Sequence, residues 1–282
     1  MTSMRFALCN EVVAALPFER QCALAAALGY AGLEIAPFTL SSDPAKLSAA
    51  DRSRLRKAAE AEGIAITGLH WLLNVPAGLS LTSDDPEVHK RTGDHMVAMV
   101  DLCADLGGKI IVHGSPKHRP LTHAATAERA RDNAVALLRR AGERAQMADV
   151  TYCIEPLSSA MTDFITTVEE ALAVIEEVEV PSVATMIDTL AAWGCEAEEP
   201  AELIRRHISS GLIGHIHLND DNMRAPGQGE RRFAPILQAL ADTGYDGIIG
   251  IEPFDYHPDG PAAAARAIGY LHGIVETLKA NS

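Results

Sequence analysis

The chain has 282 residues, of which 48% are hydrophobic and 22% are charged, and its formal net charge is −14. This composition is ordinary for a globular protein, and the length suits two domains or one large α/β barrel. The negative charge argues against nucleic acid as a partner, because phosphate binding relies on clusters of Lys and Arg, but it leaves small-molecule substrates open.

Short strand-like runs alternate with long segments rich in Ala, Leu, Glu and Arg, without a composition break that would mark a linker. Strands are predicted at 5–10, 32–37, 64–70, 109–116, 150–156, 183–189, 213–220 and 247–253. Helices are predicted after them at 17–29, 46–62, 85–106, 123–147, 166–178, 199–208, 233–243 and 261–279. Glycines stand where several helices should end, as at Gly29 and Gly107.

This repetition of strand and helix predicts a parallel sheet. Eight units in one chain favour a single (β/α)8 TIM barrel domain over 1–282 rather than an open, doubly wound α/β sheet. No G-x-G-x-x-G follows any predicted strand, which removes the dinucleotide-binding form of the open sheet.

Chargeable residues end four consecutive predicted strands, from 150–156 to 247–253. The third of these strands contains "GHIHLND", residues 214–220. The four are Glu155, Asp188, His217 and Glu252. In such a barrel the carboxyl ends of the strands form the active site. Each residue also has a structural explanation: a turn for the two Glu-Pro pairs, a helix cap for Asp188 and a hydrogen-bonded core position for the histidine.

No Lys or Arg lies in these strand ends, and unpaired charges are too costly to bury together. The four side chains therefore predict a site for one divalent metal ion. One imidazole with carboxylate oxygens suits Mn²⁺ best in our interpretation, with Mg²⁺, Co²⁺ or Zn²⁺ as alternatives.

These four residues, with "RAPGQGE" and "GYDGIIGIEPF", resemble the xylose isomerase-like barrel superfamily. The resemblance covers nearly the whole chain and is closest to the sugar isomerase/epimerase branch, which includes D-tagatose 3-epimerase and hydroxypyruvate isomerase. It implies a Glu-Asp-His-Glu metal site in which Glu155 and Glu252 also move protons. It further implies that His217 is the ligand, while His215 lies one layer deeper.

The sequence departs from the ketohexose epimerases of that branch at three substrate contacts. Their histidine, glutamate and arginine are replaced here by Ala191, Met161 and Met223, with Arg224 one place late. The metal site and its proton chemistry thus carry over by resemblance, whereas the ketohexose contacts do not.

Further residues near the strand ends are candidate substrate contacts. They are Glu34, His70, Trp71, His113, Lys117, Arg224 and Phe254. Glu34 and His70 have core hydrogen bonding as the alternative, and the two aromatic residues have packing. The loop "HGSPKHRP", which includes Lys117, is predicted either to bind a phosphate or carboxylate or to be a solvated basic loop.

The predicted function is a metal-dependent isomerase or epimerase that acts on a small keto-sugar or related hydroxy-carbonyl compound through an enediolate. A lyase on the same scaffold remains open, with keto-inositol, dehydroshikimate or 3-keto-glycoside substrates. An endonuclease IV-type enzyme fits less well, because it needs more histidines and a basic face. A non-catalytic sugar-binding barrel would not need both glutamates.

The five scattered cysteines form no C-x-x-C pair and suit a reducing compartment. No stretch resembles a signal peptide or a membrane span, so a cytoplasmic protein without a membrane partner is expected. The expected partner is a sugar-like small molecule, and the sequence is also compatible with a homo-oligomer.

Overall fold

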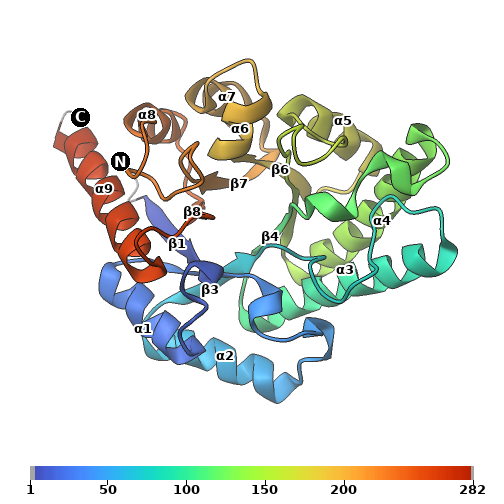
Figure 1. Ribbon diagram of the computed structural model, residues 1–282, viewed down its shortest axis with the longest axis horizontal. Coiled ribbons are helices and arrows are strands. Elements are labelled where there is room, and N and C mark those ends of the chain that lie inside the picture. The colour runs from blue at the N-terminus through green and yellow to red at the C-terminus, as the bar shows by residue number, and fades with distance from the viewer. Residues whose placement is uncertain (1–3, 281–282) are drawn as a thin grey trace.

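A computed structural model describes residues 4–280, and its centre is a closed barrel of parallel strands that follow one another in chain order (Figure 1). The strands are β1 (Arg5–Cys9), β2 (Gly32–Ile35), β3 (Ala65–Leu69), β4 (Ile110–His113), β5 (Thr151–Ile154), β6 (Val183–Asp188), β7 (Ile213–Leu218) and β8 (Ile248–Ile251). Pairing of β1 with β8 closes the ring. The predicted fold class, a (β/α)8 barrel, is confirmed.

Helices surround the barrel on its outside, as Figure 1 shows. They are α1 (Phe18–Leu28), α2 (Ala49–Ala61), α3 (Pro86–Leu106), α4 (Ala127–Ala148), α5 (Val168–Val178), α6 (Thr189–Cys195), α7 (Pro200–His207), α8 (Ala234–Asp242) and α9 (Gly260–Ala280). The last helix, α9, packs between α8 and α1 and completes the outer ring. Among residues 4–280, no helix has both the length and the apolar character that a bilayer crossing requires.

Local sequence signals explain most helix boundaries. Ser48 begins α2 by accepting a hydrogen bond from the backbone N–H of Asp51, and Asp85 begins α3 in the same way from Glu87 and Val88. Gly107 ends α3 with a φ of 88°, a left-handed conformation that glycine adopts without steric cost. The short helix α6 was not predicted, because it starts directly at the end of β6 with no loop between them.

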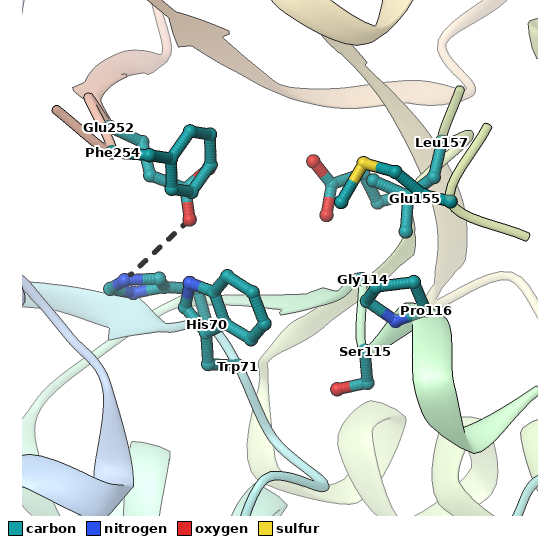
Figure 2. Close-up of a pocket in the computed structure, with 10 residues that line it drawn as sticks. His70, Trp71, Gly114, Ser115, Pro116, Glu155, Leu157, Glu252 and Phe254 are labelled. Atoms are coloured by element: carbon teal, nitrogen blue, oxygen red, sulfur yellow. Dashed lines mark ion pairs between the residues drawn. The ribbon is translucent and has the colours of Figure 1, made fainter. Parts of the chain in front are cut away.

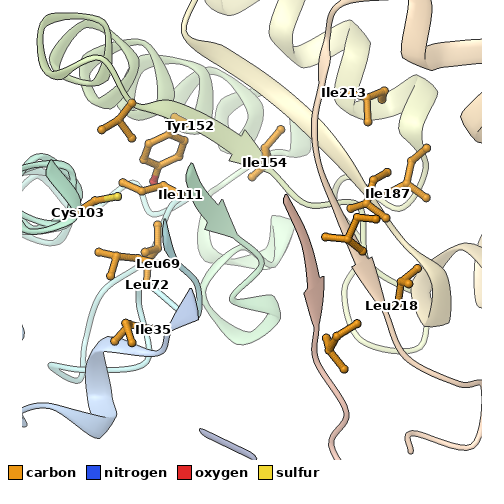
Figure 3. Packing of buried hydrophobic residues seen from close by; sticks show 14 of the residues in the cluster. Ile35, Leu69, Leu72, Cys103, Ile111, Tyr152, Ile154, Ile187, Ile213 and Leu218 are labelled. Atoms are coloured by element: carbon orange, nitrogen blue, oxygen red, sulfur yellow. The ribbon is translucent and has the colours of Figure 1, made fainter. Parts of the chain in front are cut away.

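Alternation along the strands divides the core into two layers. Tyr152 and Ile154 of β5 point outward into the large cluster between barrel and helices, whereas Cys153 between them joins the small interior cluster with Val112, Ala184 and Met186. Figure 3 shows part of the outer layer, where Ile111 of β4 faces Cys103 of α3. Each such buried aliphatic side chain contributes roughly 1.5–3 kcal/mol of transfer free energy.

The same alternation sets the direction of the site residues. Glu155 follows Ile154 directly and so lies on the interior side, like Cys153. Asp188 has the same phase as Ala184 and Met186, and it stands level with His217 in the pairing of β6 with β7. The carboxyl ends of these strands therefore direct chargeable side chains into the mouth of the barrel.

Candidate active site

Four buried side chains converge at the carboxyl ends of neighbouring strands. Glu155, Asp188, His217 and Glu252 each offer one ligand atom, and these atoms all lie within 4.8 Å of one another. Asp188 and His217 belong to β6 and β7, and the two glutamates are the residues directly after β5 and β8. The structure thus brings together all four residues that were predicted as metal ligands.

The cluster gathers three buried carboxylates around one imidazole. Burial, followed by the charges of Glu252 and Asp188, raises the pKa of Glu155 well above its ordinary value. Burial and the charge of Glu252 raise the pKa of Asp188 to about 6. Among residues 4–280, no Lys or Arg forms an ion pair with these carboxylates. A bound divalent ion would supply the missing positive charge.

The ring of His217 is held from both sides. Its Nδ1 lies 2.9 Å from Oε2 of Glu252, and its Nε2 lies 3.0 Å from Oε1 of Glu34. Nδ1 therefore faces the ligand cluster and Nε2 faces the barrel interior. Gly250 of β8 makes room for this ring, because a Cβ at that position would lie 2.5 Å from Cδ2 of His217.

Glu34 lies beneath the cluster instead of on the wall of the site, so its predicted contact with substrate is corrected. Glu34 is 0% exposed. Its Oε2 lies 2.8 Å from Nε2 of His215, and its Oε1 lies 3.0 Å from Nε2 of His217. Burial alone would raise its pKa, but the charges and hydrogen bonds of His217 and His215 outweigh burial and hold the pKa well below the usual range. His215 is thus the deeper of the two histidines.

Asp188 combines two roles that the sequence presented as alternatives. Its Oδ1 accepts a hydrogen bond from the N–H of Ala191 at 2.7 Å and so caps α6. Its Oδ2 accepts one from the side-chain amide of Asn219 at 3.0 Å. Asn219 also donates to the backbone carbonyl of Glu252 at 3.1 Å, which ties two members of the cluster together. The sequence pointed to Asn219 only as a polar residue directly after a strand.

An opening above the cluster gives small molecules access to the glutamates. Figure 2 shows Glu155 and Glu252 entering this opening from opposite sides, with Trp71 and Phe254 beside them. The two aromatic rings pack edge to face, with centroids 6.3 Å apart and an interplanar angle of 86°. Trp71 and Phe254 therefore lie where the sequence placed them, on the wall of the site.

His70 also lines the opening, at the end of β3. Its Nε2 lies 2.8 Å from Oε2 of Glu11 and 3.8 Å from Oε1 of Glu252 (the dashed line in Figure 2). Burial would lower the pKa of this imidazole, but Glu11, Glu252 and Glu34 raise it to about 9. The sequence gave no sign of Glu11, because the residue lies in a short 3-10 helix, Asn10–Val13, directly after β1.

His113 does not face the site, contrary to the prediction. Its neighbour Val112 belongs to the interior cluster, so His113 turns outward, where its Nδ1 lies 2.8 Å from the hydroxyl of Tyr152. Burial, reinforced by the charge of Arg119, lowers the pKa of His113 to about 3. It is therefore a neutral core histidine.

The two predicted basic contacts are not members of the four-residue cluster. Lys117 is exposed, and the buried cation of the same loop is Arg119, which donates to the backbone carbonyls of Glu155 at 2.7 Å and Ile165 at 3.3 Å. Arg224 pairs with Asp255 at 2.7 Å, and its neighbour Met223 is the residue that lines the site. Arg119 therefore supports the backbone under Glu155, and the substrate contacts of Lys117 and Arg224 stay predictions.

Comparison with known families agrees with this architecture. Residues 22–273 match the family model of the xylose isomerase-like TIM barrel. The chain belongs to this family. Its resemblance to the xylose isomerase-like superfamily, read from the strand-end residues, is thus confirmed.

Several relatives of this family member carry epimerase names. The D-psicose 3-epimerase of Ruminiclostridium cellulolyticum is 27% identical over 233 residues, which span 81% of this chain and 75% of that protein. The D-psicose 3-epimerase of Agrobacterium fabrum is 26% identical over 231 residues, or 81% and 76% of the two chains.

Solved structures share the fold. An L-ribulose 3-epimerase superposes with a TM-score of 0.83 at 22% identity, covering 99% of this chain and 97% of that one. The 3-keto-D-glucoside 4-epimerase of E. coli superposes with a TM-score of 0.80 at 18% identity, covering 96% of this chain and all 100% of that one. Sugar epimerases of different substrates thus share this barrel.

Proposed function

We propose that this protein is a divalent-metal-dependent epimerase or isomerase of a keto-sugar or related hydroxy-ketone. The observation that carries the proposal is the placement of Glu155 and Glu252 on opposite sides of one opening, with both in the four-residue cluster. The kinship with proteins named D-psicose 3-epimerase supports the same reaction class.

The donor set fits a divalent ion. Three carboxylates and one imidazole offer hard oxygen ligands and a single nitrogen, which suits Mn²⁺ best, with Mg²⁺, Co²⁺ or Zn²⁺ as alternatives. Such an ion, when bound, would stabilise negative charge on the oxygens of an enediolate. Glu34 and Asn219 would orient the ligands, because they hydrogen-bond His217 and Asp188 from behind.

The two glutamates account for the proton transfer. Removing a proton from the carbon next to a carbonyl requires a base within reach of that carbon. Burial and neighbouring carboxylates raise the pKa of Glu155, which makes its carboxylate a stronger base than an exposed one. A second carboxylate, Glu252, stands on the other side and can return a proton there, which inverts the carbon. If only one glutamate reaches the carbon, isomerisation or loss of water results instead.

A substrate panel tests the proposal. The purified protein is stripped with a chelator, reloaded with Mn²⁺, Mg²⁺, Co²⁺ or Zn²⁺, and incubated with D-psicose, D-fructose, D-tagatose, L-ribulose and their deoxy analogues. We expect metal-dependent conversion to an epimer or isomer. Chromatography and NMR identify the product. Products that have lost water would assign the protein to the dehydratases, and turnover that is unaffected by chelation would refute the metal's role.

A further inference from the structure

A second, larger cavity of about 460 Å³ opens beside the cluster, on the side of β5, β6 and β7. Glu155 and Asp188 form its inner end, so it is continuous with the candidate active site. Its remaining wall is mostly apolar and includes Leu157, Met161, Leu190, Ala191, Met223 and Phe254. The volume lies in the range of roughly 300–1,000 Å³ that is typical of ligand pockets and exceeds what a hydroxy-ketone end alone would fill.

Polar groups are a minority in the lining of this cavity: they are Ser158, Asp221, the indole of Trp71 and the carboxylates of Glu155 and Asp188. Asp221, at the outer edge, accepts a hydrogen bond from Arg231 at 2.6 Å. Asp188 at the inner end caps α6 and accepts from Asn219. No Lys or Arg lines the cavity in the part of the chain that the structure describes. Sugar hydroxyl groups placed against the apolar part of the wall, formed by Leu157, Leu190 and Ala191, would lose their water contacts without gaining partners, which is unfavourable.

Two methionines cover the cavity from the outside. Met161 is 47% exposed and Met223 is 48% exposed, and they are two of the four large hydrophobic side chains that are exposed among residues 4–280. Methionine is flexible and polarizable, and it adapts to apolar ligands of irregular shape. Exposed apolar side chains that gather at one opening indicate a surface that a ligand covers.

The backbone at Met223 supports the same conclusion. Met223 has a φ of 67°, in the left-handed region where glycine is normally preferred. Its carbonyl accepts hydrogen bonds from the N–H groups of Phe254 and Asp255, both at 2.8 Å, which fixes this conformation. A glycine would satisfy the backbone equally well, so the conformation does not explain the side chain. The chain therefore keeps an apolar side chain at the edge of this cavity in a conformation that costs glycine less.

We propose that the substrate of this enzyme carries an apolar substituent, a methyl, alkyl or aryl group, that occupies this cavity while the hydroxy-ketone end lies at the four-residue cluster. This inference rests on the proposed function and specifies its substrate class: deoxy-sugars or hydroxy-ketones with an alkyl or aryl group, in preference to fully hydroxylated ketoses. The apolar wall selects them because it favours a methyl group and leaves a hydroxyl unsatisfied.

The test compares matched pairs of substrates on the metal-loaded enzyme, each pair a ketose and its deoxy or aryl-substituted counterpart. In the pair that the enzyme converts best, we expect kcat/KM to be about 10-fold or more higher for the apolar member than for the hydroxylated one. This is the range that one apolar group provides in a hydrophobic pocket. Calorimetric titration of the same compounds into the Glu155→Gln variant measures the preference without turnover. Equal affinities, or a preference for the hydroxylated member, would overturn the inference.

Met223→Gly separates the pocket from the fold. It removes the apolar side chain but keeps a residue that tolerates the left-handed backbone, so we expect an unchanged or higher Tm and a loss of about 10-fold in the preference for the apolar member. Glu179→Gly is the matched control, because Glu179 is exposed, has a φ of 56° and follows α5 outside the cavity. Its preference should equal that of the wild type. An unchanged preference in Met223→Gly would contradict the role of this residue.

The two proposals fail in different ways. If no compound in any pair is epimerised or isomerised with metal present, the proposed reaction is wrong. The calorimetric preference between pair members then still decides whether the cavity takes an apolar group.

Discussion

Glu34 lies 3.0 Å from Nε2 of His217, although the two residues are 183 positions apart in the chain. Both ring nitrogens lie against carboxylates, because Nδ1 is also 2.9 Å from Oε2 of Glu252, and although burial would lower the pKa of His217, the charges of Glu34 and Glu252 raise it well above its ordinary value. Once a metal ion replaces the proton on Nδ1, the carboxylate of Glu34, which can only accept, would keep the remaining proton on Nε2. Nδ1 is left as the nitrogen that faces the other three carboxylates. Glu34 thereby determines which atom of His217 is presented to a metal ion.

Glu34→Gln should weaken metal binding without removing a ligand. We expect the affinity for Mn²⁺ to fall about 10–100-fold, as is common when a carboxylate behind a ligating histidine is lost. Titration of the chelated protein with Mn²⁺ measures this. Glu170→Gln serves as the control, because Glu170 lies in the first turn of α5, outside the groups of residues that could hold a metal ion. If both variants bind Mn²⁺ equally well, Glu34 has no part in the site.

The two histidines of β7 should respond differently to replacement by alanine. His217→Ala removes a ligand and should abolish tight metal binding. His215→Ala removes the partner of Oε2 of Glu34 and should mainly lower the free energy of unfolding, by roughly 1–3 kcal/mol. Denaturation curves and metal titration on both variants separate the outcomes. Equal loss of metal in two folded variants would show that His215 is also a ligand.

Metal binding should strengthen as pH rises. Burial and neighbouring carboxylates raise the pKa of Asp188 to about 6 and that of Glu155 well above its ordinary value, so protons compete with the metal at low pH. The stability of the metal-free protein should change in the opposite direction with pH. The pKa of Asp188 is about 6 in the folded state and about 4 in the unfolded state, so its protonation stabilises the fold fully below about pH 4. This contribution is lost as pH rises through about 6.

The increase in Tm on adding Mn²⁺ should therefore be larger at pH 8 than at pH 5.5, measured by differential scanning fluorimetry at fixed metal concentration. The chelated protein scanned at both pH values gives the baseline. A metal-induced shift that is equal at both pH values would argue against buried carboxylate ligands with raised pKa values.

The sequence was sufficient to predict the barrel and the convergence of the four strand-end residues, because both follow from local patterns. Alternation along each strand and repetition of strand and helix are visible without tertiary information. Asp188 shows the limit, since it is a helix cap and a member of the cluster at once.

The wrong predictions concern residues whose direction depends on strand register. Glu34 was expected at the rim, but it ends lower in the barrel, next to a register shift between Leu33 and Glu34 in the pairing of β2 with β3. His113 lies on the outer side of its strand, one residue out of phase with the interior. The sequence did not predict the contacts of Glu11 and Asn219, because their partners are distant in the chain.

Glu155→Gln and Glu252→Gln address the proton carriers. Each change keeps the shape of the side chain and one oxygen but removes the base, so each should lower turnover by about 10²-fold or more. Substrate binding should fall less, because the apolar wall of the cavity is unchanged. Glu170→Gln is a matched control, since this glutamate lies in the first turn of α5, outside the cluster.

Isotope exchange makes the same prediction more specific. In D₂O the wild type should introduce deuterium at the carbon next to the substrate carbonyl, because a carboxylic acid that has taken a proton can exchange it with water. NMR of the recovered substrate and product detects the label, and both Gln variants should introduce it more slowly. Slow exchange in a closed site would suppress the label even with active glutamates, so turnover decides the matter. Near-normal turnover in both variants would rule out the two glutamates as bases and leave the cluster as a structural metal site or a centre for hydride shift.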